Sequence, residues 1–164
     1  MAVDFSGVVG LLTGAGVEVI VIGGLAAQAH GSARITQDSD FLYRRTKENI
    51  DRLTAALAPH DPYLRGAPPG LPFRFDAPTV GRGLNFTLVT SLGDIDLLGE
   101  VSGVGGYEAV LPHATTLAVF GHQVLVIDLP WLIRSKRAAG RPKDLEAIAE
   151  LEALLAERER SRSG

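Results

Sequence analysis

The sequence contains no cysteine, which excludes disulfide bonds, thiolate metal sites and cysteine nucleophiles. It has no excess of positive charge, because 16 basic and 19 acidic residues give a net charge of -3, so no global field attracts a long nucleic acid. The most apolar stretch, residues 17–27, contains Glu18 and two glycines and falls short of the roughly 18 residues of a membrane span. The N-terminus carries Asp4 where a secretory signal has basic residues. These absences predict a soluble, cytoplasmic protein with no membrane partner.

The length of 164 residues and the 46% of hydrophobic residues are sufficient for one domain with its own core. In the first half, hydrophobic spacing and turn residues predict alternating helices and strands at residues 4–13 (helix), 17–22 (strand), 25–30 (helix), 38–43 (strand) and 46–59 (helix). His30 is interpreted as a helix-end or packing residue. This alternation predicts an α/β (α+β) fold with a mixed central sheet and flanking helices.

The second half begins with residues 59–84, a segment rich in proline, glycine and arginine that predicts a lid or binding loop. Strands are expected at 84–90, 94–101, 115–120 and 122–127, and two helices are expected at 128–140 and from Pro142 onward. The tail 157–164 is expected to fray. We therefore predict one domain over residues 1–164, with a catalytic core at 1–127 and a C-terminal helical pair at 128–160.

Two acidic pairs lie on predicted strands. Asp38 and Asp40 are two residues apart, so their side chains leave the same face with Cα atoms roughly 6–7 Å apart, close enough to share a cation. An isolated pair of this kind is more often only an acidic strand end. Asp94 and Asp96 repeat the spacing on a later strand, and Asp96 is the better third ligand because it lies within the strand, whereas Asp94 suits a turn. Three carboxylates suit Mg²⁺ or Mn²⁺, which prefer oxygen ligands.

A glycine pair, Gly23 and Gly24, lies between a buried strand and a helix. Backbone N–H groups at such a turn can face phosphate, and glycine allows close approach, although glycine is also common there for steric reasons alone. A glycine turn, an acidic pair on the next strand and a third acid on a later strand have one economical explanation, which is a site for phosphoryl transfer.

Several polar residues are candidates for contact with a triphosphate. Arg34 and Thr36 precede the first acidic pair, and Lys136 and Lys143 lie in the C-terminal helices with Arg141 between them. The alternative is that they are surface residues, since cations near helix ends also complement the helix dipole. The loop residues Arg65, Arg74 and Arg82 could grip an acceptor or be simply solvated.

The run GGLAAQAHGSARITQDSDFL resembles the nucleotidyltransferase superfamily related to DNA polymerase beta, in the form found in AbiEii-type and related small bacterial nucleotidyltransferases. The segment LIRSKRAAGRPKDLEAI is similar to the Lys, Arg-x-Lys-Asp segment of those proteins. The resemblance covers about Val17 to Leu155. It departs from the family at Gly24, where members often have serine, and at Ser39, where many have an apolar residue.

The resemblance implies transfer of a nucleoside monophosphate (NMP) from a nucleoside triphosphate (NTP) to an acceptor hydroxyl, with release of pyrophosphate. Gly23 and Gly24 would hold the phosphates, Asp38 and Asp40 would bind the metals, and Asp96 would position a metal and accept the hydroxyl proton. The acceptor is expected to be a protein, an RNA or a small molecule. We expect the enzyme to be the toxin-like half of a two-protein toxin-antitoxin module. A cognate partner or a second copy of the chain would complete the site.

Two other functions stay open at this point. A catalytically silent module of the same fold would bind nucleotide or a partner without turnover, but clustered acids without a cation repel one another. A metal-dependent nuclease also uses clustered acids. It is disfavoured because no lysine follows an acidic pair at short spacing and because the glycine turn would have no role.

Overall fold

The structure is a computed structural model that describes residues 3–163. Its α-helices are α1 (Phe5–Gly14), α2 (Gly23–Ala29), α3 (Lys47–Leu57), α4 (Ala77–Arg82), α5 (Tyr107–Val110), α6 (Leu129–Ala139) and α7 (Pro142–Ser163). Its strands are β1 (Val19–Val21), β2 (Ser39–Tyr43), β3 (Tyr63–Leu64), β4 (Phe86–Thr90), β5 (Gly93–Leu98), β6 (Glu100–Val101), β7 (Gly105–Gly106), β8 (Ala114–Val119) and β9 (His122–Ile127). Short 3-10 turns occupy Ala58–His60 and Leu111–His113.

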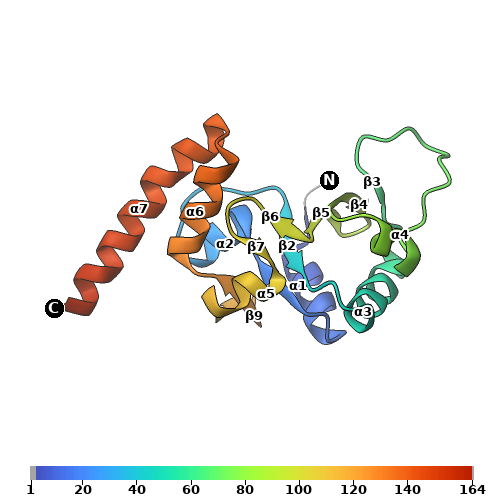
Figure 1. Ribbon diagram of the computed structural model, residues 1–164, viewed down its shortest axis with the longest axis horizontal. Coiled ribbons are helices and arrows are strands. Elements are labelled where there is room, and N and C mark those ends of the chain that lie inside the picture. Colours follow the sequence, from blue (N-terminus) through green and yellow to red (C-terminus); the bar gives the residue numbers. More distant parts are fainter. Residues whose placement is uncertain (1–2, 164) are drawn as a thin grey trace.

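Within the described residues, a seven-stranded mixed sheet runs in the order β3-β4-β5-β2-β1-β9-β8. The strands β1 and β2 are antiparallel, whereas β2 pairs in parallel with β5 and β1 pairs in parallel with β9. The strands β6 and β7 form a separate small hairpin. Figure 1 shows α6 and α7 together at one end of the molecule and the loop after β3 at the other. The predicted mixed sheet with flanking helices and a C-terminal helical pair is confirmed.

The helices begin where the sequence supplies capping side chains. Thr46 caps α3 by accepting a hydrogen bond from the N–H of Asn49, and Asp128 caps α6 by accepting from the N–H of Trp131. Gly140, with a left-handed backbone at φ 65°, ends α6. The helices expected to begin at residues 46 and 128 therefore begin there, each with its capping side chain.

The core lies on one face of the β4–β5 part of the sheet because buried and exposed residues alternate along both strands. Leu88, Ile95 and Leu97 are fully buried, and so are Leu12 of α1 and Leu53 of α3. The other face of the same strands carries Asp94 and Asp96, which are only partly buried. The alternation of the sequence thus leaves the acids on the face away from the core.

Several boundaries differ from the sequence-based expectation. The strand expected at 94–101 is divided, because β5 ends at Leu98 and β6 belongs to the separate hairpin. The segment 59–84 is not wholly irregular, because it contains β3 and α4, and Asp76 caps α4 through the N–H of Thr79. The strand β2 begins at Ser39, so Asp38 is the last loop residue before it. The tail does not fray up to Ser163, because Arg158 of α7 contacts the ring of His30. Residues 3–163 form no helix with both the length and the apolar character that crossing a membrane requires.

Candidate active site

The turn between β1 and α2 approaches the first acidic pair closely. Gly23 has φ 63°, and a Cβ atom at this position would lie 2.1 Å from Oδ2 of Asp40. Gly24 lies under Thr36, whose hydroxyl oxygen is 2.7 Å from the place of a Cβ atom. Both positions therefore require glycine, because a side chain would displace Asp40 or Thr36. A serine at residue 24 would likewise not fit beneath Thr36 unless Thr36 moved.

Asp40 and Asp96 are direct neighbours across two parallel strands, since the register pairs these two residues. Partial burial, the hydrogen bond between the two carboxyl groups and the negative charges of Asp96 and Asp38 raise the pKa of Asp40 to about 7. The charges of Asp96 and Asp38 thus both act on the carboxyl group of Asp40. The structure thus places Asp96 beside Asp40, although these two acids come from different parts of the chain.

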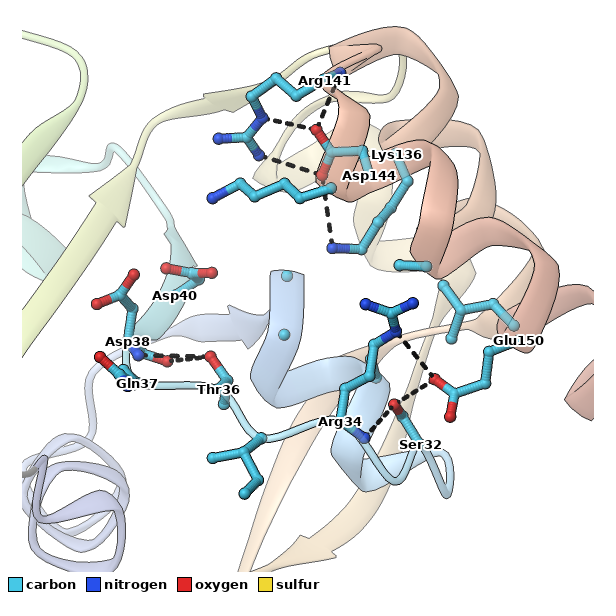
Figure 2. Close-up of a pocket in the computed structure, with 17 residues that line it drawn as sticks. Ser32, Arg34, Thr36, Gln37, Asp38, Asp40, Lys136, Arg141, Asp144 and Glu150 are labelled. Atoms are coloured by element: carbon cyan, nitrogen blue, oxygen red, sulfur yellow. Dashed lines mark hydrogen bonds and ion pairs between the residues drawn. The ribbon is translucent and has the colours of Figure 1, made fainter.

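Asp38 precedes the strand, and its loop is held by Thr36. The Thr36 hydroxyl donates a hydrogen bond to the carbonyl of Asp38 at 3.2 Å. The same oxygen accepts from the N–H of Asp38 at 3.4 Å. Thr36 therefore shapes the turn that carries Asp38 toward Asp40 (Figure 2).

Asp94 and Asp96 share one cationic partner, Arg65, which directly follows β3. Its Nε lies 3.2 Å from Oδ2 of Asp94, and its Nη2 lies 2.7 Å from Oδ1 of Asp96. Nη2 also donates to the carbonyl of Leu88 at 3.0 Å. Arg65 is therefore neither free to grip an acceptor nor simply solvated, because it neutralises the acids on the outer side of the site.

A first cavity of about 290 Å³ opens beside Gly23, Gly24, Asp38 and Asp40. Its lining carries four basic side chains, which are Arg34, Lys136, Arg141 and Lys143. It also carries four acids, which are Asp38, Asp40, Asp144 and Glu150. Figure 2 shows the basic side chains of α6 and of the α6–α7 junction facing Asp38 and Asp40 across this space. All the predicted site residues except Asp96 line this cavity.

The basic side chains Lys136 and Arg141 form a cationic wall around Asp144, whose side chain is 2% exposed. Arg141 donates to both its oxygens, at 2.6 Å to Oδ2 and 3.2 Å to Oδ1, and the Lys136 ammonium is 3.8 Å from Oδ1. Burial by itself raises the pKa of Asp144, but the hydrogen bonds and charge of Arg141 outweigh it, so the pKa is lowered. Burial lowers the pKa of Lys136, and the charges of Asp144 and Asp40 oppose that effect. Asp144 thus holds two cations at the cavity.

The loop that carries Arg34 is tied to α7 through Glu150. This carboxylate accepts from the hydroxyl of Ser32 at 2.6 Å and from the N–H of Ala33 at 3.2 Å. The guanidinium Nε of Arg34 is 3.8 Å from the same carboxylate. These contacts position the loop between α2 and β2 over the first cavity (Figure 2).

A second cavity of about 260 Å³ lies on the other side of the same wall. It shares Gly23, Asp40, Lys136, Arg141 and Asp144 with the first cavity. Its remaining lining comes from Ile22, the end of β5, the β6–β7 hairpin, α6 and Asn85. Asp40 therefore lines two adjoining cavities, whereas Asp38 lines only the first.

The donor set at these acids suits a hard divalent cation with substrate phosphates as further ligands. Residues 3–163 contain no group of three acidic or histidine side chains that forms a ready-made metal cluster. Mg²⁺ does not need one, because it is usually held by one or two carboxylates together with waters and phosphates. A nearby cation would relieve the repulsion between carboxylates that contributes to the raised pKa of Asp40. The residues therefore fit Mg²⁺ or Mn²⁺, and the binding itself stays a prediction.

Sequence reasoning missed three residues of this site. Asp144 was considered only as the last residue of the Arg-x-Lys-Asp motif, with no role of its own. An acid three residues after Arg141 at a helix start is nevertheless a local signal for an ion pair. Sequence reasoning passed over Glu150, which lies 118 residues from its partner Ser32. It treated Arg65 as a loop residue because nothing in the sequence links it to Asp94 and Asp96.

Comparison with known proteins supports the fold. No protein-family model and no curated protein matches the chain. The chain is similar to the crystal structure of an antigenic nucleotidyltransferase-like protein from Paracoccidioides brasiliensis, with a TM-score of 0.54 and 17% identity. The match covers 97% of this chain and 87% of that one. At this identity the likeness shows the fold, so the chain has a nucleotidyltransferase-like fold, and the predicted fold class is confirmed.

Proposed function

We propose that this protein is a metal-dependent nucleotidyltransferase of the small bacterial, AbiEii-type group, which moves NMP from an NTP to an acceptor hydroxyl. The observation that carries the proposal is the register of Asp40 and Asp96 beside Gly23, at the edge of a cavity with four basic side chains. Carboxylates for cations and bases for phosphate are the two requirements of phosphoryl transfer, and here they face each other.

The residues divide the chemical work as follows. The backbone at Gly23 and Gly24, the hydroxyl of Thr36 and the cations Arg34, Lys136 and Lys143 bind the triphosphate. Asp38, Asp40 and Asp96 would hold Mg²⁺ or Mn²⁺, which supplies charge neutralisation at the phosphoryl oxygens when bound.

The oxygen of the acceptor hydroxyl forms a bond to the α-phosphorus, and Asp96 accepts the proton that this hydroxyl loses. The bond between the α-phosphorus and the oxygen that bridges it to the β-phosphorus breaks. Pyrophosphate leaves with the electron pair of this bond. The basic side chains of the first cavity receive the charge of this leaving group.

The test is pyrophosphate release from each of four NTPs with Mg²⁺ or Mn²⁺, with cell extract as the source of acceptor and mass analysis of the labelled product. We expect Asp40→Asn to lower release to background, because the carboxamide cannot neutralise a cation. Asp51→Asn is the matched control. Asp51 is an exposed acid on α3, and within the described residues its one ion pair is with Lys47. Undiminished activity of Asp40→Asn would refute the proposal.

One observation favours a second candidate, a catalytically silent module that binds nucleotide or a partner. Arg65 occupies Asp94 and Asp96 and so competes with a cation for the third carboxylate. The silent module predicts that NTP raises the melting temperature without any pyrophosphate release. Arg65→Met separates the two candidates, because release that appears only in this variant indicates a site blocked by Arg65.

A further inference from the structure

The second cavity differs from the first in its chemistry. The residues that line the second cavity but not the first are mainly apolar or neutral. They include Asn85, Leu98, Val101, Ser102, Ser135 and Ala139. Glu100 is its one charged residue not shared with the first cavity among the described lining. The second cavity thus has three acids against two bases, whereas the first has four of each, and it adds no cation of its own. The residues that only the second cavity has are thus uncharged apart from Glu100, and they suit an uncharged group better than a phosphate.

The wall of the second cavity is a built structure. The β6–β7 hairpin packs on α6 at Gly103, where φ is 78° and a Cβ atom would lie 2.5 Å from the Cβ of Ala138. Arg134 of α6 donates to the carbonyl of Gly103 at 2.8 Å. On the other side, Asn85 accepts from the N–H of Gly99 at 2.9 Å, so its amide oxygen anchors the end of β5. The hairpin, α6 and β5 therefore hold a defined hollow.

Resting on the proposed function, we infer that the second cavity binds the nucleoside, its base and ribose, of the same NTP whose phosphates occupy the first cavity. The two cavities share five lining residues, so one elongated ligand can run through both. Each volume alone is below the roughly 300–1,000 Å³ of most ligand sites, whereas the two together fall within that range. A molecule with a polyanionic end and a neutral, hydrogen-bonding end matches this division.

The acceptor does not fit the second cavity equally well. Asp96, the proposed proton acceptor, lies outside its described lining. Across the sheet, the order from Gly23 through Asp40 to Asp96 continues to β4 and then to β3 with Arg65. An acceptor hydroxyl that gives its proton to Asp96 therefore approaches from the side of β4 and Arg65, outside the second cavity. This leaves the second cavity to the nucleoside.

Hydrogen-bonding groups in the second cavity can read the nucleoside. The hydroxyl of Ser135 donates to the carbonyl of Leu132 at 2.7 Å, so it presents its lone pairs as acceptors. The side-chain oxygen of Asn85 already accepts a hydrogen bond from the N–H of Gly99, so the NH₂ group of Asn85 is the part that can donate to a ligand. Leu98 and Val101 provide apolar surface for the face of a base.

The experiment is isothermal titration calorimetry with Mg²⁺ and two kinds of probe. Tripolyphosphate reports on the first cavity alone, and the α,β-methylene analogues of the four NTPs report on both cavities without releasing pyrophosphate. Ala139→Trp on α6 and Ser102→Trp on the β6–β7 hairpin fill the second cavity from exposed positions. Ala153→Trp on the exposed surface of α7 is the matched control.

We expect both filling variants to weaken the best-binding analogue by about tenfold or more, to near the affinity of tripolyphosphate, which itself changes by less than about twofold. Retained tripolyphosphate binding also shows that a variant is folded. Unchanged analogue binding in both filling variants, or an equal loss for both probes, overturns the inference and leaves the proposed function intact. If neither probe binds the wild-type protein, the proposed function fails and the inference fails with it.

Discussion

Single side chains at the site carry charges that burial alone would suppress. Asp144 stays ionised because Arg141 and Lys136 contact it, and it keeps both cations at the first cavity. Asp40 is in the opposite situation, because its nearest charges are other carboxylates and its pKa rises to about 7. Asp144 thus partly neutralises Arg141 and Lys136, whereas Asp40 lies among other carboxylates whose repulsion a bound cation would relieve.

His30 makes the stability of the protein sensitive to acid. Its buried ring contacts the carbonyl of Ile127 at 2.7 Å through Nε2, and Arg158 is 3.3 Å from Nδ1. Burial and the charge of Arg158 lower its pKa, against the opposing effects of Ile127 and Asp128. A lowered pKa means that the unfolded chain binds the proton more readily. The stability due to neutral His30 is therefore complete above a pH of about 6.5 and is lost as the pH falls toward the folded pKa.

We expect His30→Gln to lose less of its melting temperature between a pH of about 7.5 and about 5 than the wild-type protein does. Glutamine can still donate to the carbonyl of Ile127 but does not titrate. Melting curves by circular dichroism at both pH values measure the difference, and carboxylates contribute equally to both proteins. Equal acid sensitivity of the two proteins would mean that His30 does not act in this way.

At the scale of elements, the β1–α2 turn is the part that positions the acids. Its backbone passes so close to Asp40 that only glycine fits at residue 23, and the left-handed φ adds the same requirement. The strands β2 and β5 then align Asp40 with Asp96 through their parallel register. The turn and the two strands therefore form the smallest unit that assembles the acidic edge.

Gly23→Ala tests this role of the turn. We expect a loss of about 1–2 kcal/mol in the free energy of unfolding, because alanine is strained at φ 63° and its Cβ displaces the carboxylate of Asp40. Stabilisation by Mg²⁺ with nucleotide should disappear in the same variant. Urea unfolding with and without these ligands measures both effects.

Gly14→Ala is the control for this substitution, because nothing lies within 4 Å of a Cβ atom at Gly14 in α1. Its stability should be equal to or above that of the wild-type protein. If the two variants behave alike, the close approach of Gly23 to Asp40 does not matter.

At the scale of the whole molecule, the site is assembled from both ends of the chain. The sheet contributes the acids, and the helical pair α6 and α7, which Figure 1 shows side by side, contributes the cations. A ligand that binds both sets holds these parts together and so stabilises the folded state. Metal and nucleotide should therefore act jointly on the stability of the whole protein.

We expect Mg²⁺ with an α,β-methylene nucleotide to raise the melting temperature by more than the sum of the separate effects. At a ligand concentration about 100 times the Kd, the stabilisation is about 2.7 kcal/mol. Differential scanning fluorimetry measures it, and EDTA should abolish the joint part. Strictly additive shifts would show that metal and nucleotide bind at separate places.

The order of elements, the caps at Thr46 and Asp128 and the two acidic pairs could be read from the sequence, because each depends on residues close in the chain. Spacing of apolar residues sets helix or strand, and alternation sets which face a side chain takes. The resemblance to nucleotidyltransferases rested on the same local motifs. The fold class and the face that carries Asp96 were therefore determined by the sequence itself.

Only the tertiary structure decided what each charge meets. Arg65 meets Asp94 and Asp96 because β3 and β5 are both hydrogen-bonded to β4. Ser32 meets Glu150, and His30 meets Arg158, across more than a hundred residues of chain. The division into two cavities depends on a hairpin that packs on α6. Local patterns cannot specify such contacts, because they arise from the packing of elements that are distant in sequence, and the energy of a charge depends on the neighbours that packing brings to it.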